Sequence, residues 1–234
     1  MAILEPIGEN LWLIDGPEVR AYGLPFPTRM LIARLRSGAL WVWSPIHLDE
    51  ALRHAVETLG EPRYAVEPNK LHHLALSEWV KMWPALQLYA PPGLVKKRRD
   101  VQFTAELSDE PPPEWRGEID QVCIRGNVFM TEVFFFHRAS STCLVGDLIQ
   151  KHDVRRMPTW MRWVTKATGV AGEAGGTPLD GRLTFVHRDA ARESIGRALA
   201  WSPRRLVIAH GSCFMEGGAD VLRRSFHWLL QARG

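Results

Sequence analysis

The stretch VEPNKLHHLALSEW, residues 66–79, places two adjacent histidines, His72 and His73, between an apolar run and a helical pattern. The residues RYAVE that lead into it predict a short β-strand, and Pro68-Asn69 predicts a turn. The following LALSEWVKMW predicts a helix that stops near Pro84. Paired imidazoles in a loop directly after a strand are typical of a metal site, because neutral imidazole is a common metal ligand.

Two further strand patterns end in a side chain that can bind metal. TCLVG is followed by Asp147, and RLVIA is followed by His210. The loops at one edge of a sheet lie on the same side, which is where α/β folds build their sites. A lone histidine after a strand is more often a hydrogen-bonded structural residue, and a lone aspartate is often a helix N-cap. The joint occurrence of the three features, taken together with the family resemblance given below, is what predicts a hydrolytic metal centre with an open position for water.

The remaining patterns predict an α/β chain. NLWLIDG reads as a strand, and MLIARL and ALWVWS read as a hairpin around Ser37-Gly38. Between these strands, the prolines of YGLPFPTR predict an extended loop. Helices are expected over residues 47–60, 158–169 and 188–201, and one amphipathic helix over GADVLRRSFHWLLQA. The Gly-rich GVAGEAGGTP is expected to be a flap. Both halves read as strands followed by α/β units, so we expect one domain, residues 1–234, built as a two-sheet sandwich flanked by helices.

Composition excludes several classes of protein. The chain has 234 residues and a formal net charge of +3, too weakly basic to indicate nucleic-acid binding. Its three cysteines are far apart and fit neither a disulfide framework nor a zinc ribbon, which favours a reducing compartment. No signal peptide and no apolar run of about 20 residues is present, so no membrane partner is expected. We expect a cytoplasmic protein whose partner is a small-molecule substrate; the sequence does not indicate an oligomeric state.

These features resemble the metallo-β-lactamase superfamily, whose members are mostly metal-dependent hydrolases with an αββα sandwich. The order of features matches over most of the chain: hairpin strands, a histidine loop, Gly-Asp after a strand, and a late strand ending in His-Gly. More narrowly, PFPTRM, SPI, PNKLHHL, FFFHRASSTCLVGDL and AHG resemble a branch of that superfamily that is catalogued as a domain of unknown function. The resemblance implies a four-layer αββα sandwich, and a divalent metal ion that is zinc first, with iron or manganese as alternatives.

The ligand set that the resemblance implies departs from the superfamily pattern. The histidine loop of the superfamily reads H-x-H-x-D-H; aligned on its last histidine, this chain has Pro68, Lys70, His72 and His73 at the four positions. The ligands of one metal site are therefore missing. His72, His73, Asp147 and His210 correspond to the other site, which predicts a mononuclear centre. The aspartate expected at the end of an early strand is replaced by Ser44, and the intervening histidine falls near Asn127.

Further residues receive roles by the same resemblance. Glu132 in MTEVFFF is a possible further ligand, or else a strand residue facing a polar interior. Asp147 is expected to be catalytic, as a ligand that also orients the bound water. Asn69, Lys70 and Arg138 are expected to contact an anionic substrate, and Glu67 to hold an imidazole tautomer.

Three functions follow from this set and stay open at this point. The first is a metal-dependent hydrolase of a small ester, thioester or phosphoester. The second is a catalytically degenerate binding or scaffold protein on the same fold, because half of the usual ligands are absent. The third is an iron redox protein. A serine hydrolase is not indicated, because no G-x-S-x-G turn is present, and no nucleotide-binding glycine motif opens a helix.

Overall fold

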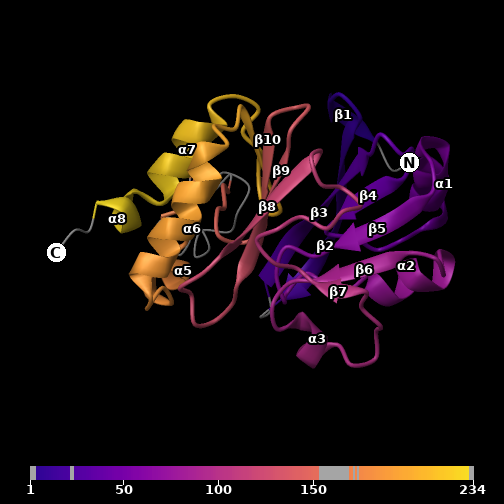
Figure 1. Ribbon diagram of the computed structural model, residues 1–234, viewed down its shortest axis with the longest axis horizontal. Helices are drawn as coiled ribbons and strands as arrows, with labels where there is room; N and C mark the ends of the chain where they lie inside the picture. The colour runs from indigo at the N-terminus through magenta and orange to yellow at the C-terminus, as the bar shows by residue number, and fades with distance from the viewer. Residues whose placement is uncertain (1–3, 22–23, 153–168, 171, 173, 232–234) are drawn as a thin grey trace.

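The computed structural model describes residues 4–21, 24–152, 169–170, 172 and 174–231. The described chain forms two β-sheets stacked face to face, with helices on both outer faces (Figure 1). Helices α5 to α8 lie on the left of the view and α1 and α2 on the right, with the sheets between them, and α3 lies at the bottom. This arrangement is the predicted αββα sandwich.

The first sheet contains the strands of the N-terminal half in sequence order. They are β1 (Glu5–Gly8), β2 (Leu11–Ala21), β3 (Leu24–Arg34), β4 (Leu40–Trp43), β5 (Pro62–Val66), β6 (Gln87–Ala90) and β7 (Ala105–Glu106). The pairs from β1 to β4 are antiparallel, and those from β4 to β7 are parallel. Parallel pairing requires crossovers, so β4, β5 and β6 all end at the same edge of the sheet.

The second sheet is assembled from β8 (Ile119–Ile124), β9 (Glu132–His137), β10 (Thr142–Val145) and β11 (Arg205–Ile208), in the spatial order β11-β10-β9-β8. β10 and β11 are parallel neighbours in register, with Val145 opposite Ile208. The residues that follow these two strands therefore leave the sheet side by side. β9 is antiparallel to β10, so β9 begins at the edge where β10 ends.

Helices α1 (Glu50–Leu59), α2 (Leu76–Met82) and α3 (Leu94–Lys97) cover the first sheet. Helix α1 begins at Asp49, whose carboxylate accepts a 2.7 Å hydrogen bond from the backbone N–H of Leu52, and buries Leu52 and Val56 one turn apart. Helices α5 (Leu179–Leu183), α6 (Arg188–Ala200), α7 (Gly218–Ser225) and α8 (His227–Leu230) lie on the second-sheet side.

Three layers of buried side chains hold the sandwich together. The middle layer lies between the two sheets and is rich in aromatic residues, including Trp41, Trp43, Trp115 and Phe135. Trp41 meets Phe135 of the opposite sheet edge-on, with ring centroids 5.2 Å apart. The other two layers lie between each sheet and its helices. The many tryptophans of the chain thus serve largely as packing.

Two predictions of secondary structure are corrected. The prolines of YGLPFPTR lie inside β3, which pairs with β2 over ten residue pairs from Leu11↔Ala33 to Ala21↔Leu24, so residues 24–29 of this segment are strand and not loop. The predicted C-terminal helix is interrupted at Phe226, which separates α7 from α8. The helix predicted over residues 158–169 lies almost entirely outside the described residues, and the predicted flap is described only in part.

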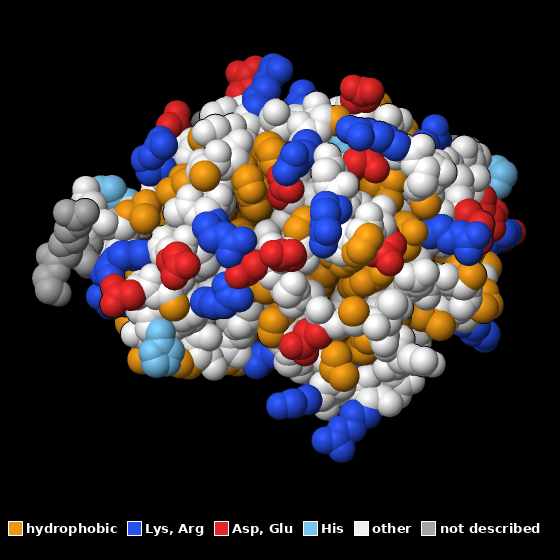
Figure 2. Space-filling model, viewed as in Figure 1, with side chains coloured by type: hydrophobic (Ala, Val, Ile, Leu, Met, Phe, Trp, Pro, Cys, Tyr) orange, Lys and Arg blue, Asp and Glu red, His pale blue; other side chains and the backbone are white. Residues whose placement is uncertain are grey.

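The surface charges and the free cysteines are those of an ordinary globular domain. On the face seen in Figure 2, charged side chains of both signs are interspersed. The three cysteines form no disulfide, and two of them, Cys123 and Cys143, are buried. Among the described residues, no helix is both long enough and apolar enough to cross a membrane.

Candidate metal centre

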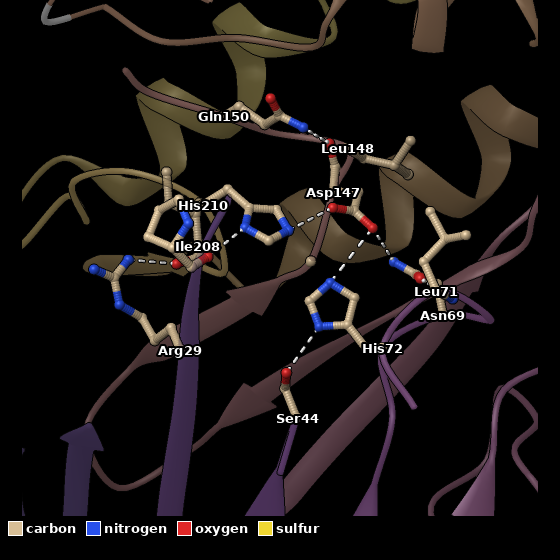
Figure 3. Close-up of polar contacts among 12 residues, drawn as sticks. Arg29, Ser44, Asn69, Leu71, His72, Asp147, Leu148, Gln150, Ile208 and His210 are labelled. Carbon is tan, nitrogen blue, oxygen red and sulfur yellow. Dashed lines mark hydrogen bonds and ion pairs between the residues drawn. The ribbon is translucent and has the colours of Figure 1, made fainter. Parts of the chain in front are cut away.

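Three of the predicted ligands meet where the loops that follow strands of the two sheets come together. His72 lies in the loop between β5 and α2, Asp147 follows β10, and His210 follows β11. The Nε2 atom of His210 lies 2.9 Å from Oδ1 of Asp147, and Nε2 of His72 lies 3.4 Å from Oδ2 (Figure 3). One ligand atom from each residue can be chosen so that all lie within 4.8 Å of one another. Such spacing allows two imidazoles and a carboxylate to share one ion.

The Nδ1 atoms of His72 and His210, which are not the nitrogens facing Asp147, both have hydrogen-bond partners. Nδ1 of His210 lies 2.8 Å from the carbonyl oxygen of Pro27, and Nδ1 of His72 lies 2.8 Å from Oγ of Ser44. A carbonyl only accepts, so His210 carries a proton on Nδ1 and turns Nε2 toward Asp147. Second partners of this kind fix the tautomer in metal-binding histidines. In His210 both nitrogens face acceptors, which requires either a second proton or a cation at Nε2.

The charges within the cluster shift its pKa values. Burial would raise the pKa of Asp147, but the electrostatic interaction with His72 and the hydrogen bond from His210 hold it well below the usual range. Burial would lower the pKa of His210, but the hydrogen bond and charge of Asp147 raise it. Asp147 is therefore an ionised carboxylate facing two imidazoles, an environment that favours a cation.

Glu132 holds the Asp147 loop from beneath and is fully buried. Its carboxylate accepts the backbone N–H groups of Gly146 (2.8 Å), Asp147 (2.7 Å) and Leu148 (3.2 Å), and the side-chain amide of Asn69 (3.0 Å). Burial, with the negative charge of Asp147, raises the pKa of Glu132 to about 8, against the effect of these donors. With four donors on its two oxygens, Glu132 is a support for Asp147 and not a fourth ligand.

The close packing around Gly146 explains why the Gly-Asp motif has a glycine at this position. A Cβ atom on Gly146 would lie 3.0 Å from Nδ2 of Asn69 and 3.1 Å from Oε2 of Glu132. A side chain at residue 146 would therefore be tight against Asn69 and Glu132, which would have to move by a few tenths of an ångström to admit it. Gly211, after His210, has a φ of +96° and passes against the backbone of Lys151, where a Cβ would overlap the carbonyl.

Asn69 is committed to the same support. Its Nδ2 donates to Oδ2 of Asp147 (2.8 Å) as well as to Glu132, and its Oδ1 accepts from the backbone N–H of Leu71 (2.8 Å). It is fully buried. The predicted role in substrate contact is therefore replaced by one in orienting Asp147, because no donor or acceptor of the amide faces outward.

His73, the fourth predicted ligand, is not brought into the group. Its Nδ1 lies 3.1 Å from Nη1 of Arg98, which also donates to the His73 carbonyl oxygen. Burial and the charges of Lys97 and Arg98 lower its pKa. Adjacent residues on a turn point in different directions, and here the second imidazole faces α3. Among the described residues, three of the four predicted ligands are thus brought together.

Three further residues with predicted site roles lie outside the His72–Asp147–His210 cluster. Arg138 follows the far end of β9, where it pairs with Asp120 at 2.7 Å, so it does not reach the cluster. The Nζ atom of Lys70 lies 4.7 Å from the ring centroid of Phe129. The buried carboxylate of Glu67 has no hydrogen-bond partner among the described residues, so it holds no imidazole.

Ser44 is a site residue whose role the sequence indicated only by its position. Ser44 directly follows β4, and its φ is +53°, a left-handed conformation that is uncommon for a residue with a side chain. That conformation aims Oγ at His72. Arg29 is a site residue for which the sequence analysis predicted no role. Its Nη1 donates to the carbonyl oxygens of Ile208 and Gly211, both at 2.6 Å, and so links β3 to the His210 loop.

The cluster opens into a cavity of about 550 Å³ between the loops of the two sheets. All three candidate ligands and Ser44 line it, together with side chains from the β2–β3 ribbon, the loop before α2, the loop before β9 and the region of α5. Asn127, where the superfamily pattern expects a histidine, also lines it; its Nδ2 donates to Thr184 Oγ1 at 2.7 Å. The site thus combines an ion-binding cluster with a substrate-sized space.

No protein-family model matches the sequence, and no curated protein matches it. Solved structures do match over nearly the whole chain. DIM-1 metallo-β-lactamase is 15% identical with a TM-score of 0.66, and the match covers 99% of this chain and 98% of that one. The chain has the metallo-β-lactamase fold.

Two other structures with the metallo-β-lactamase fold show the same likeness. A metallo-β-lactamase from Pontibacter korlensis is 13% identical, with a TM-score of 0.64 and all of both chains covered. FIM-1 from Pseudomonas aeruginosa, solved in a mono-zinc form, is 11% identical, with a TM-score of 0.65 and 99% and 96% covered. At these identities the likeness establishes the fold, and the chemistry has to be argued from the cluster.

Proposed function

We propose that the protein is a metal-dependent hydrolase of the metallo-β-lactamase superfamily with one metal ion, held by His72, Asp147 and His210. The observation that carries the proposal is that both Nε2 atoms face one ionised carboxylate while both Nδ1 atoms are engaged by Ser44 and Pro27. This is the donor set and the supporting shell that a transition metal requires. Zinc is the first candidate, and iron and manganese are the alternatives.

The chain's own residues supply position and charge. When bound, such an ion acidifies a water molecule and polarises a substrate oxygen. Asp147 orients that water from its fixed place, since Asn69 and the Glu132-bound loop restrict its rotation. The cavity gives a small ester, thioester or phosphoester access to the cluster. A cytoplasmic location, predicted from the cysteine content, is part of this proposal.

An iron redox role is the second candidate, because two histidines and one carboxylate are also the ligand set of non-haem iron oxygenases. An absorption spectrum of fresh protein, recorded beside its metal content, separates the two. Iron charge-transfer bands with no hydrolysis would favour the redox role, and a colourless zinc protein that hydrolyses esters would favour the hydrolase.

The direct test is metal content after purification without chelator. We expect about one equivalent of metal in the unaltered protein and less than about a tenth in His72→Ala, His210→Ala and Asp147→Asn, because each removes one of few ligands. His73→Ala is the matched control: it removes the neighbouring imidazole and is expected to retain the metal and the hydrolysis of p-nitrophenyl acetate. Full metal content in His72→Ala and His210→Ala would refute the proposal. A metal-free, inactive protein would favour the scaffold alternative.

A further inference from the structure

The walls of the cavity are mostly apolar. Beside the three ligands it is lined by side chains that cannot hydrogen-bond, among them Val19, Leu71, Leu74, Phe129, Met130 and Pro178. Two of these large side chains are also exposed, Leu74 by 67% and Phe129 by 46%. Exposed apolar side chains gathered around a concavity indicate a surface that a ligand covers.

The charge of the lining argues against an anionic ligand. No lysine or arginine is among the described residues that line the cavity, whereas Glu78 and Asp180 are. Glu78 is bound by Nδ1 of His47 at 2.9 Å and by the backbone N–H of Leu48 at 2.9 Å. A phosphoester, or a thioester with a phosphorylated carrier, would meet the metal ion and, over Phe129, the ammonium of Lys70, but no lysine or arginine of the lining itself, and it would lie beside two carboxylates.

The size of the cavity argues against a very small substrate. A volume of about 550 Å³ lies within the range of sites that enclose a ligand of many heavy atoms. An acetyl ester would leave the apolar walls in contact with water. A longer hydrocarbon portion would cover them and gain free energy with every methylene it buries.

We infer that the substrate is an uncharged carboxylic ester with a long apolar portion that lies against Leu74 and Phe129. This rests on the proposed function and narrows it from esters, thioesters and phosphoesters to one class. In the reaction the oxygen of water forms a bond to the carbonyl carbon, and the bond from that carbon to the ester oxygen breaks. One proton of the water passes to the departing alcohol, and the other is released as the acid ionises.

The first experiment measures kcat/KM of the metal-loaded protein for p-nitrophenyl acetate, butanoate, hexanoate and octanoate, and for bis(p-nitrophenyl) phosphate. We expect kcat/KM to rise by up to about fourfold per methylene over the first steps, because each methylene is transferred from water to an apolar wall. The phosphodiester is expected to be the poorest substrate. Equal values for acetate and octanoate, or preference for the phosphodiester, would overturn the inference and leave the hydrolase standing.

The second experiment needs no turnover, so it separates this inference from the proposed function. Metal-depleted protein is titrated with 2-nonanone, 2-butanone and heptylphosphonate, and binding is followed by calorimetry. The long uncharged ketone is expected to bind at least about tenfold more tightly than the short ketone and the anion. Such binding without hydrolysis of any ester would sink the hydrolase while keeping the ligand class. Tighter binding of the phosphonate would overturn the inference.

Two variants locate the effect. Leu74→Ala and Phe129→Ala alter exposed side chains, so both are expected to fold, and each should flatten the dependence of kcat/KM on chain length. Val95→Ala is the matched control, because Val95 is also an exposed apolar residue (41%) but lies on α3 and does not line the cavity. An undiminished dependence in the double variant Leu74→Ala/Phe129→Ala would contradict the inference.

Discussion

The two ends of the β9–β10 pair both hold a buried histidine in a polar cluster, but the clusters differ in kind. At one end, Glu132 and the Asp147 loop present an ionised carboxylate to His72 and His210 beside an open cavity. At the other end, Nδ1 of His137 lies 2.8 Å from Oγ of Ser140, which donates to Oγ1 of Thr142 at 2.8 Å.

This difference teaches that the partner of the imidazole decides its role. His210 faces Asp147, and the hydrogen bond and charge of that carboxylate raise its pKa despite burial. No carboxylate in the described part of the chain bonds to His137, and burial lowers its pKa to about 4. The first environment favours a cation and the second excludes one. Three experiments test whether the two ends are as different as this.

The largest effect is expected at the His137 end, on stability at acid pH. The folded state keeps His137 neutral down to about pH 4, whereas the unfolded chain takes up the proton near pH 6.5. Between these values the unfolded state binds more protons, so the free energy of unfolding falls as the pH falls, by about 3 kcal/mol in all. Urea unfolding of the unaltered protein and His137→Gln at pH 7 and pH 4.5 measures it. The free energy of unfolding of His137→Gln should fall less between pH 7 and pH 4.5 than that of the unaltered protein, and the variant should keep its metal. If both proteins lose the same free energy of unfolding between these pH values, His137 is not the group responsible.

A smaller effect is expected from Glu132→Gln at the other end. The test is made at pH 9, above the pKa of about 8 that burial and the charge of Asp147 give Glu132, where the carboxylate is ionised. There the amide would turn an NH₂ group toward backbone N–H donors and loosen the Asp147 loop. Changes to groups that orient metal ligands typically weaken metal affinity by about 10- to 100-fold, which a zinc titration would detect. Glu67→Gln is the matched control, because Glu67 is equally buried and its pKa is raised well above the usual range by burial, but it has no hydrogen-bond partner among the described residues. Equal losses in the two variants would show that Glu132 has no special role.

The smallest effect is expected from Ser44. Ser44→Ala and Ser44→Gly both remove one hydrogen bond to His72, worth about 1 kcal/mol, so each should weaken metal affinity by about two- to tenfold. The pair separates this bond from backbone strain, because glycine tolerates a φ of +53° and alanine does not. Ser44→Gly is therefore expected to unfold at a higher urea concentration than Ser44→Ala while binding metal equally weakly. A difference in metal affinity between them would point to the backbone instead.

Much of the architecture could be predicted from the sequence because it rests on local patterns. The strands before His72, Asp147 and His210 are short apolar runs closed by turn residues, and the structure has a strand at each place. The fold follows from their order. The rule that strands of one sheet end at a common edge accounts for Asp147 and His210, which follow parallel neighbours. His72 follows a strand of the other sheet, and only the family resemblance placed it with them.

The remaining details depend on contacts that no local pattern encodes. Proline predicts an extended backbone, but only the pairing of β3 with β2 makes the segment around Pro25 and Pro27 a strand. The directions of His72 and His73 differ because Arg98, on another element, engages the second of them. Likewise, Glu132 and Asn69 could be recognised as polar, but their roles depend on the loop that they bind.

The hydrogen bond between the Pro27 carbonyl and His210 joins residues 183 positions apart in the chain. Contacts of such long sequence separation form late in folding, because the intervening chain must be closed into a loop first. An ion would therefore find its complete set of donors only in a nearly finished molecule. The ion would therefore stabilise the native state and would not nucleate folding. Metal depletion should accelerate unfolding much more than it slows refolding.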